Sequence, residues 1–138
     1  MSDDQLVEAA LAVMKNAYVA YSKFPVGAAL LTESGEIIVG ANHENASNGA
    51  TICAERSAMV TALSQGHRKF KAVAVTSELA EAAAPCGICR QFLIEHGNMK
   101  VILASSTSKE RYITQLTDLL PRAFTPALLE TFNEMKKE

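Results

Sequence analysis

All three cysteines of this 138-residue chain lie in two short segments, which constrain the fold more than any other feature. The segments are Cys53-Ala54-Glu55-Arg56 and Pro85-Cys86-Gly87-Ile88-Cys89. Three soft donors are typical of a catalytic zinc site, which takes three protein ligands and leaves a fourth position for water. A fold that serves this chemistry must bring two segments that are distant in the chain to one point.

The spacing of the cysteines supports a shared site. Cys86 and Cys89 are three positions apart at the start of a predicted helix, so both thiolates can face the same point, and Cys53 starts another predicted helix. The partial positive charge of a helix N-terminus stabilises a thiolate. We therefore predict that Cys53, Cys86 and Cys89 bind one zinc ion. We expect Arg56 to donate to a thiolate and offset the excess negative charge.

Glu55 follows Cys53 by two positions, in the first turn of the same predicted helix. A carboxylate there can reach the fourth position of the metal without occupying it, and can carry protons between water and substrate. A C-x-x-C pair alone also fits a redox site, but a thiol oxidoreductase needs neither Cys53 nor Glu55. A structural zinc site closed by a nearby histidine stays open as an alternative. The histidines at 43, 67 and 96 fall in loops or at a helix end, which favours surface positions.

Hydrophobic periodicity and turn residues predict the order αββαβαβ followed by a terminal helix. Ser2 and Gln5 have the spacing of a capping box for the first helix. Helices are expected at 3–20, 53–64, 86–96 and 126–135. Strands are expected at 26–31, 37–41, 70–76 and 101–103, with a weaker one at 112–116.

This order predicts an α/β fold, specifically a three-layer α/β/α sandwich around a mixed five-stranded sheet. The first two strands form an antiparallel hairpin, whereas later helical crossovers favour parallel pairs. The chain length suits one compact domain, so we expect a single domain over residues 1–138.

Charge and composition narrow the class of substrate. The net charge is −2 and the lysines and arginines form no stripe, so we expect a small-molecule substrate and no nucleic-acid partner. There is no secretory signal pattern, and no apolar run approaches a membrane span, so no membrane partner is expected. An odd number of cysteines fits a disulfide framework poorly, which favours a cytoplasmic location.

Motifs outside the zinc segments carry a resemblance to a known family. They are Tyr21-Ser22-Lys23-Phe24-Pro25-Val26-Gly27-Ala28-Ala29, Asn42-His43-Glu44-Asn45-Ala46-Ser47, and Leu119-Leu120-Pro121 followed by Phe124. With them, nearly the whole chain resembles the small, homotetrameric cytidine deaminases. The zinc motifs alone indicate the wider cytidine and deoxycytidylate deaminase superfamily. The segments around Phe24 and Asn42 narrow the resemblance to enzymes that act on free nucleosides.

The resemblance implies a cytidine deaminase-like fold and a hydrolase of pyrimidine salvage. Such an enzyme converts cytidine and 2'-deoxycytidine to uridine and 2'-deoxyuridine with release of ammonia. It implies one Zn²⁺ per subunit, held by the three cysteines, with Glu55 as the proton shuttle. It also implies a homotetramer.

By the same resemblance, Phe24 packs on the pyrimidine, Asn42 and Glu44 hold the ribose hydroxyls, and Ala54 contributes to the substrate site. Ala46, Asn48 and Phe124 are expected to reach the pocket of a neighbouring subunit. Two residues have a plain structural alternative: Phe24 as a core aromatic, and Phe124 as a side chain packed within its own subunit.

One departure bears on specificity. Many members of the family carry an aromatic residue where this chain has Asn48, and an amide offers no comparable stacking area. The preference among cytidine, deoxycytidine and bulkier analogues is therefore open. The alternatives are deamination of a related aminopyrimidine nucleoside such as blasticidin S, or of cytosine within a polynucleotide, against which the missing basic stripe argues.

Overall fold

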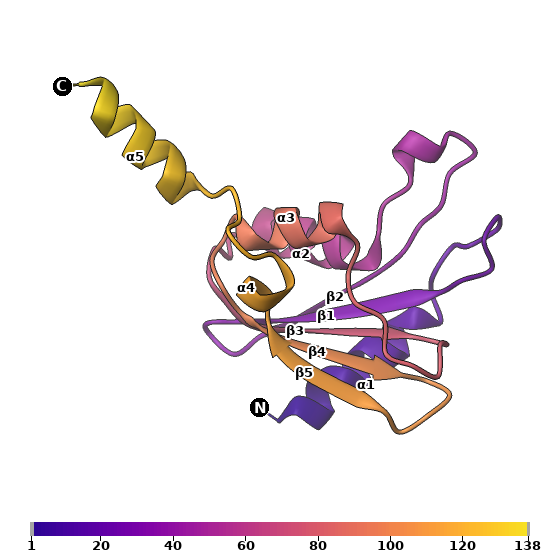
Figure 1. The fold of residues 1–138 in the computed structure, drawn as a ribbon. Helices are drawn as coiled ribbons and strands as arrows, with labels where there is room; N and C mark the ends of the chain where they lie inside the picture. Colours follow the sequence, from indigo (N-terminus) through magenta and orange to yellow (C-terminus); the bar gives the residue numbers. More distant parts are fainter. Residues whose placement is uncertain (1, 138) are drawn as a thin grey trace.

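The computed structural model describes residues 2–137 and consists of a five-stranded mixed sheet covered by helices (Figure 1). The strand order is β2-β1-β3-β4-β5. The strands are β1 (Val26–Thr32), β2 (Ile37–Ala41), β3 (Phe70–Ser77), β4 (Lys100–Ser105) and β5 (Arg111–Gln115). The helices are α1 (Asp3–Met14), α2 (Ala54–Ser64), α3 (Gly87–Ile94), α4 (Leu116–Leu119) and α5 (Pro126–Lys136), with a short 3₁₀ turn at Asn48–Ala50.

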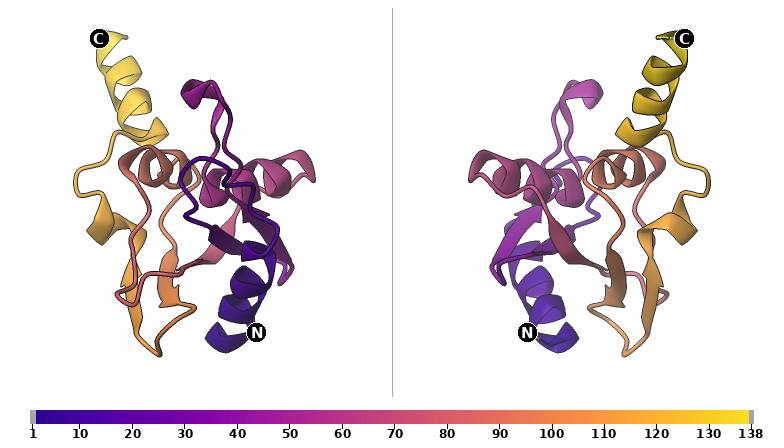
Figure 2. Two further views of the ribbon diagram at one scale, coloured as in Figure 1. Left: turned by 90° about the vertical axis from the view of Figure 1, so that its right-hand side faces the viewer. Right: turned by 90° about the vertical axis from the view of Figure 1, so that its left-hand side faces the viewer.

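Helices lie on both faces of the sheet (Figure 2), and a hydrophobic layer lies on each face. On one face, Leu6, Val7 and Ala10 of α1 pack on Ala29, Ala74 and other strand residues. On the other face, α2 and α3 pack on alternate strand residues such as Leu30, Val73 and Val101. Because successive side chains of a strand point to opposite faces, the continuous apolar runs of β3 and β4 supply both layers. This confirms the predicted three-layer α/β/α sandwich.

Strand pairing confirms the mixed sheet. β1 pairs antiparallel with both β2 and β3, β3 pairs parallel with β4, and β4 pairs antiparallel with β5. The turn between β1 and β2 contains Gly35 at φ 97°, a left-handed conformation that glycine adopts without a Cβ clash. The parallel β3–β4 pair requires a crossover, which α3 provides.

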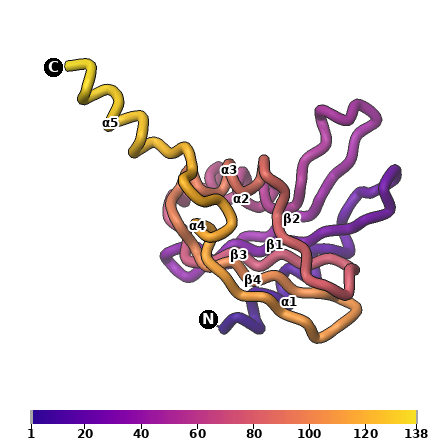
Figure 3. Tube along the Cα trace, in the orientation of Figure 1, coloured from indigo at the N-terminus to yellow at the C-terminus, as the bar shows by residue number. Residues whose placement is uncertain are grey.

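Two loops extend beyond one end of the sheet, residues 15–25 and 42–53 (Figure 3). They are joined where Tyr18 forms a β-bridge with His43. The N–H of Tyr18 donates to the carbonyl of Asn42, and the N–H of Glu44 donates to the carbonyl of Tyr18. This pairing explains an error in the sequence prediction: the first helix ends at Met14, not near residue 20, because the following residues form extended backbone contacts instead.

Other boundaries differ less. The capping box of Ser2 and Gln5 is present. The helix predicted at 86–96 spans Gly87–Ile94, with Cys86 as its N-cap. The single turn α4 was not predicted, since four residues carry too little periodicity to identify a helix.

The last helix, α5, extends away from the rest of the molecule (Figures 1 and 3). None of its residues is buried, and its apolar side chains Leu128, Leu129, Phe132 and Met135 are 47–66% exposed. Among residues 2–137, we find no helix with both the length and the apolar character that crossing a membrane requires.

Candidate metal centre and substrate pocket

Two helix starts bring the three cysteines together. Cys53 is the N-cap of α2, Cys86 is the N-cap of α3, and Cys89 lies in the first turns of α3. Their sulfur atoms all lie within 4.8 Å of one another. Cys89 is buried, Cys53 is half-buried and Cys86 is exposed, so the cluster lies at the boundary between core and surface.

Cys53 and Cys89 lie close together, and each shifts the pKa of the other. The neighbouring Cys89 thiol, with help from Arg56, lowers the pKa of Cys53 to about 5. The neighbouring Cys53, together with burial, raises the pKa of Cys89. Cys53 is therefore the easier of the two to ionise, and a bound metal ion would displace the proton of a thiol ligand that still carries one.

Arg56 lies against the cysteine cluster. Its Nη2 lies 3.5 Å from the sulfur of Cys53, to which it donates a hydrogen bond, and the contact raises the pKa of the guanidinium. Its Nε is buried and has no hydrogen-bond partner within residues 2–137. A partly buried guanidinium beside clustered sulfurs favours a site that carries negative charge.

The donor set fits zinc with an open position. Among the described residues, the group that could hold a metal ion contains the three cysteines and no fourth His, Asp or Glu. The histidines lie elsewhere: His67 pairs with Glu36 at 2.7 Å, His96 packs edge-on against Phe70, and His43 is exposed on its loop. This geometry argues against the alternative of a structural zinc site closed by histidine.

Glu55 lies in the first turn of α2 and is only 4% exposed. Burial raises its pKa to about 7, and the neighbouring charge of Cys53 acts in the same direction. A carboxyl group with such a pKa can both accept and donate a proton near neutral pH, which suits general acid–base catalysis.

A cavity of about 240 Å³ opens beside the cysteines. It is lined by residues from both long loops, the start of α2, the end of β3 and the loop before α3. Those predicted from the sequence are Phe24, Asn42, Cys53, Ala54, Glu55 and Cys86; those added by the structure are Val26, Val75, Ser77, Ala83 and Ala84. Because Phe24 lines this cavity and is 36% exposed, it is not a core aromatic.

The other predicted residues lie outside this cavity. Glu44 and Asn48 line a neighbouring polar hollow of about 440 Å³ together with Ser22. Ala46 is exposed on the same loop. Phe124 is 59% exposed, and its carbonyl accepts a hydrogen bond from Gln91 of α3. Within one chain, neither Ala46 nor Phe124 lines the cavity beside the cysteines.

Arg90, which the sequence analysis did not identify, holds the loop before Cys86 by hydrogen bonds. Its Nε donates to the carbonyl of Pro85 at 2.7 Å, and its Nη1 donates to the carbonyl of Leu119 at 2.8 Å. These bonds tie the loop before Cys86 to the end of α4. The sequence offered no signal for this role beyond the position of Arg90 next to Cys89, because both acceptors are backbone atoms.

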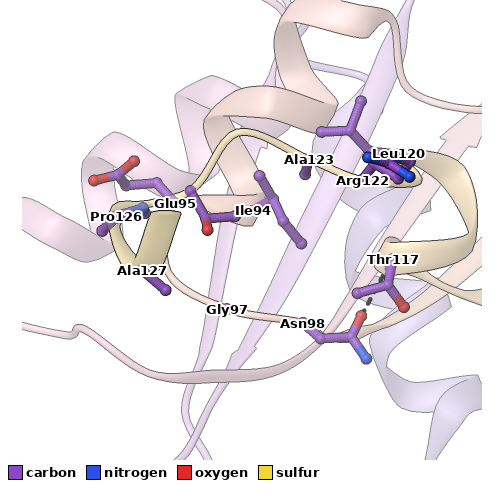
Figure 4. Close-up of a pocket in the computed structure, with 11 residues that line it drawn as sticks. Ile94, Glu95, Gly97, Asn98, Thr117, Leu120, Arg122, Ala123, Pro126 and Ala127 are labelled. Atoms are coloured by element: carbon purple, nitrogen blue, oxygen red, sulfur yellow. Dashed lines mark hydrogen bonds between the residues drawn. The ribbon is translucent and has the colours of Figure 1, made fainter. Parts of the chain in front are cut away.

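A third cavity, also of about 440 Å³, lies between the end of α3, α4 and the start of α5 (Figure 4). Its wall includes Ile94, Leu120 and Ala123, and the N–H of Thr117 donates to the side chain of Asn98 at its edge. None of its lining residues is a cysteine or a histidine. The chemistry of the chain is therefore concentrated in the smaller cavity.

Comparison with known proteins agrees with this site. Residues 1–105 match the family model of the cytidine and deoxycytidylate deaminase zinc-binding region. The chain is 44% identical over 127 residues to a cytidine deaminase of Halalkalibacterium halodurans, covering 91% of this chain and 96% of the relative. It is 40% identical over 123 residues to a probable cytidine deaminase of Dictyostelium discoideum, covering 88% of this chain and 83% of the relative.

A solved structure shares the fold as well as the sequence. The crystal structure of cytidine deaminase from Burkholderia pseudomallei has a TM-score of 0.87 and 45% identity to this chain, and the match covers 90% of this chain and 100% of that chain. The family match spans both zinc-binding segments, and the relatives align along most of their length. The chain therefore belongs to the cytidine and deoxycytidylate deaminase family.

Proposed function

We propose that this chain catalyses the zinc-dependent hydrolysis of cytidine and 2'-deoxycytidine to uridine and 2'-deoxyuridine, with release of ammonia. The observation that carries the proposal is the meeting of three cysteine sulfurs and the buried Glu55 at one cavity lined by Phe24. The relatives named above as cytidine deaminases support the same substrate class. None of these observations favours blasticidin S or a polynucleotide.

The three cysteines would hold one Zn²⁺ per subunit, which supplies Lewis-acid activation of the attacking water. Glu55 takes a proton from that water and delivers it to N3 of the pyrimidine. The water oxygen adds to C4, and Glu55 then takes the remaining proton from the C4 hydroxyl so formed and gives it to the 4-amino group. The C4–N bond breaks, ammonia leaves and C4 becomes the carbonyl of uridine. Water and cytidine are thereby converted to uridine and ammonia, and Glu55 returns to its starting state.

The remaining site residues bind and orient the nucleoside. Phe24 packs on the pyrimidine, with Ala54 beside it in the same cavity. Asn42 and Glu44 face the two adjoining hollows, where the ribose hydroxyls would lie. The backbone carbonyl of Ala84 can accept a hydrogen bond from the 4-amino group.

We further propose that the chain is a single domain that acts as a cytoplasmic homotetramer in pyrimidine salvage, with no nucleic-acid partner. Unpaired cysteines are best preserved in a reducing compartment. Exposed apolar residues on α5, together with Ile88 at 67% exposure and Phe124, favour burial against other copies. Ala46, Asn48 and Phe124 would then reach the pocket of a neighbouring subunit.

The decisive test is an ammonia-release assay on cytidine, with zinc content measured on the same sample. We expect activity in proportion to zinc content, its loss on chelation, and its recovery when zinc is added back. A purified protein that is free of metal and fully active would contradict the proposal. So would a zinc-loaded protein that releases no ammonia from cytidine or deoxycytidine.

A further inference from the structure

The carboxylate of Glu44 is bound to the chain segment that carries Phe24. Its Oε1 accepts the N–H groups of Tyr21 and Ser22, each at 3.0 Å. Its Oε2 accepts the hydroxyl of Ser22. These hydrogen bonds lower the pKa of Glu44, and the bond from the Ser22 hydroxyl has the largest effect. Glu44 therefore stays ionised and acts as an anchor for the loop.

Ser22 connects the carboxylate of Glu44 to the backbone of Phe24. The N–H of Phe24 donates to the hydroxyl oxygen of Ser22 at 3.0 Å, so one hydroxyl donates to Glu44 and accepts from Phe24. On the other side, the carbonyl of Phe24 accepts from Nδ2 of Asn42 at 2.9 Å. The N–H of Val26 donates to Oδ1 of Asn42 at 2.9 Å. The backbone of Phe24 is thus held at both ends.

The loop between these contacts is strained. Lys23 has φ 60°, in the left-handed region that is unfavourable for a residue with a Cβ. Such a conformation persists only where surrounding contacts determine it. The N–H of Lys23 donates to the carbonyl of Val19 at 3.0 Å, and the bonds of Ser22 hold the next peptide. Loss of the Ser22 hydroxyl would therefore free Phe24 to move.

We propose that Ser22 is a positioning residue that sets Phe24 over the substrate base. The inference rests on the proposed function, and deepens it, because Phe24 lines the cavity beside Cys53 and Glu55. Ser22 acts on the pyrimidine end of the nucleoside through Phe24, and does not act by holding a sugar hydroxyl. The bonds that Glu44 makes to the loop are part of the same support.

The test compares two ligands in S22A and S22T. Cytidine carries the 2'- and 3'-hydroxyls of the ribose, whereas 2',3'-dideoxycytidine lacks both of them. We expect S22A to raise the KM for cytidine and the Kd for dideoxycytidine, measured by calorimetry, by the same factor of about fivefold, the effect of losing one hydrogen bond. The kcat should change by less than about twofold, since the lost interaction is uniform binding. S22T keeps the hydroxyl and should recover most of both losses.

A double-mutant cycle with F24A tests whether Ser22 works through Phe24. If it does, S22A adds less than about twofold to the KM of F24A, because coupled residues are not additive. Three outcomes overturn the inference: a loss confined to cytidine, an additive loss in S22A/F24A, or no change in S22A. A thermal midpoint and zinc content equal to wild type show that S22A is folded. A wild-type chain that binds dideoxycytidine without deaminating cytidine would contradict the proposed function, while the Kd values of dideoxycytidine in S22A and S22T would still test the role of Ser22.

Discussion

At the scale of single residues, a metal centre with three cysteine ligands carries an excess of negative charge. Three thiolates around a divalent cation leave a net charge of −1, which weakens the cation as a Lewis acid. Arg56 offsets this charge through its contact of 3.5 Å with the sulfur of Cys53. The N-termini of α2 and α3 act in the same direction, because Cys53 and Cys86 are their N-caps.

Replacing Arg56 should therefore weaken metal binding. In R56Q the guanidinium charge is lost while a polar side chain of similar reach remains. We expect about 10–100-fold weaker zinc affinity, the usual effect of removing a partner of a metal ligand. Competition with a chelator of known affinity measures it, and R56K, which keeps the charge, is the matched control. Equal zinc affinity in R56Q and wild type would show that Arg56 does not support the ligands.

Glu55 is expected to contribute to turnover and not to metal binding. E55Q keeps the volume of the buried side chain but cannot carry protons, so kcat should fall by about 10²–10⁴-fold. Zinc content should stay at that of wild type, because the three cysteines supply the ligands. Single-turnover kinetics on cytidine, with zinc measured on the same sample, test both statements. An E55Q variant with wild-type turnover would exclude Glu55 as the proton carrier.

At the scale of elements, the distance between α2 and the sheet determines where Glu55 lies. Gly40 of β2 faces α2, and a Cβ at this position would lie 2.3 Å from the backbone nitrogen of Ala58 and 2.8 Å from the carbonyl oxygen of Ala54. Both contacts are with backbone, so a side chain there cannot be relieved by a change of rotamer. The helix that carries Glu55 lies this close to β2 because residue 40 has no side chain.

Substitution of Gly40 should lower the stability of the fold and displace the helix that carries Glu55. We expect G40A to lower the free energy of unfolding by about 3 kcal/mol, at the upper end of overpacking in a core. G49A is the control, because a Cβ at Gly49 meets nothing within 4 Å and its φ lies outside the left-handed region; its change should stay within about 0.5 kcal/mol. Denaturant unfolding compares the two, and equal stability of G40A and G49A would refute the packing argument.

At the scale of the whole molecule, the exposed C-terminal region points to assembly. The backbone carbonyl of Phe124 accepts a hydrogen bond from Gln91 of α3, and the residue is 59% exposed. Beyond it, α5 extends away from the body with its apolar side chains in solvent. Association that covers these side chains would remove a large apolar area from water. If Phe124 enters a neighbouring pocket, each active site is completed by another copy.

Subunit mixing tests this arrangement. F124A should raise the KM for cytidine by on the order of tenfold if an aromatic contact is lost, and E55Q should be inactive. Co-expression of the two variants creates sites with intact Glu55 beside a neighbour with intact Phe124. We expect their KM to return toward the wild-type value, and sedimentation equilibrium to give a tetramer. A mixture that keeps the KM of F124A would place Phe124 within its own subunit.

The sequence predicted most of the fold because its patterns are local. Capping residues, a hairpin turn and alternating strands and helices identify elements from neighbouring residues alone. The end of α1 was predicted wrongly since it depends on the bridge between Tyr18 and His43, which are distant in the chain. The single turn α4 and its bond to Arg90 depend on similar long-range contacts.

For the site, the sequence by itself determined the chemistry: three cysteines and an acid at fixed spacing, with an arginine next to them. Residue types and short intervals are enough for this, because each helix start positions its own ligands. Only the tertiary structure decided that the two helix starts meet at one cavity. It also decided that Glu44, Ser22 and Asn42 hold the backbone of Phe24. Those contacts join separate loops, and their energy exists only once the sheet has brought the loops together.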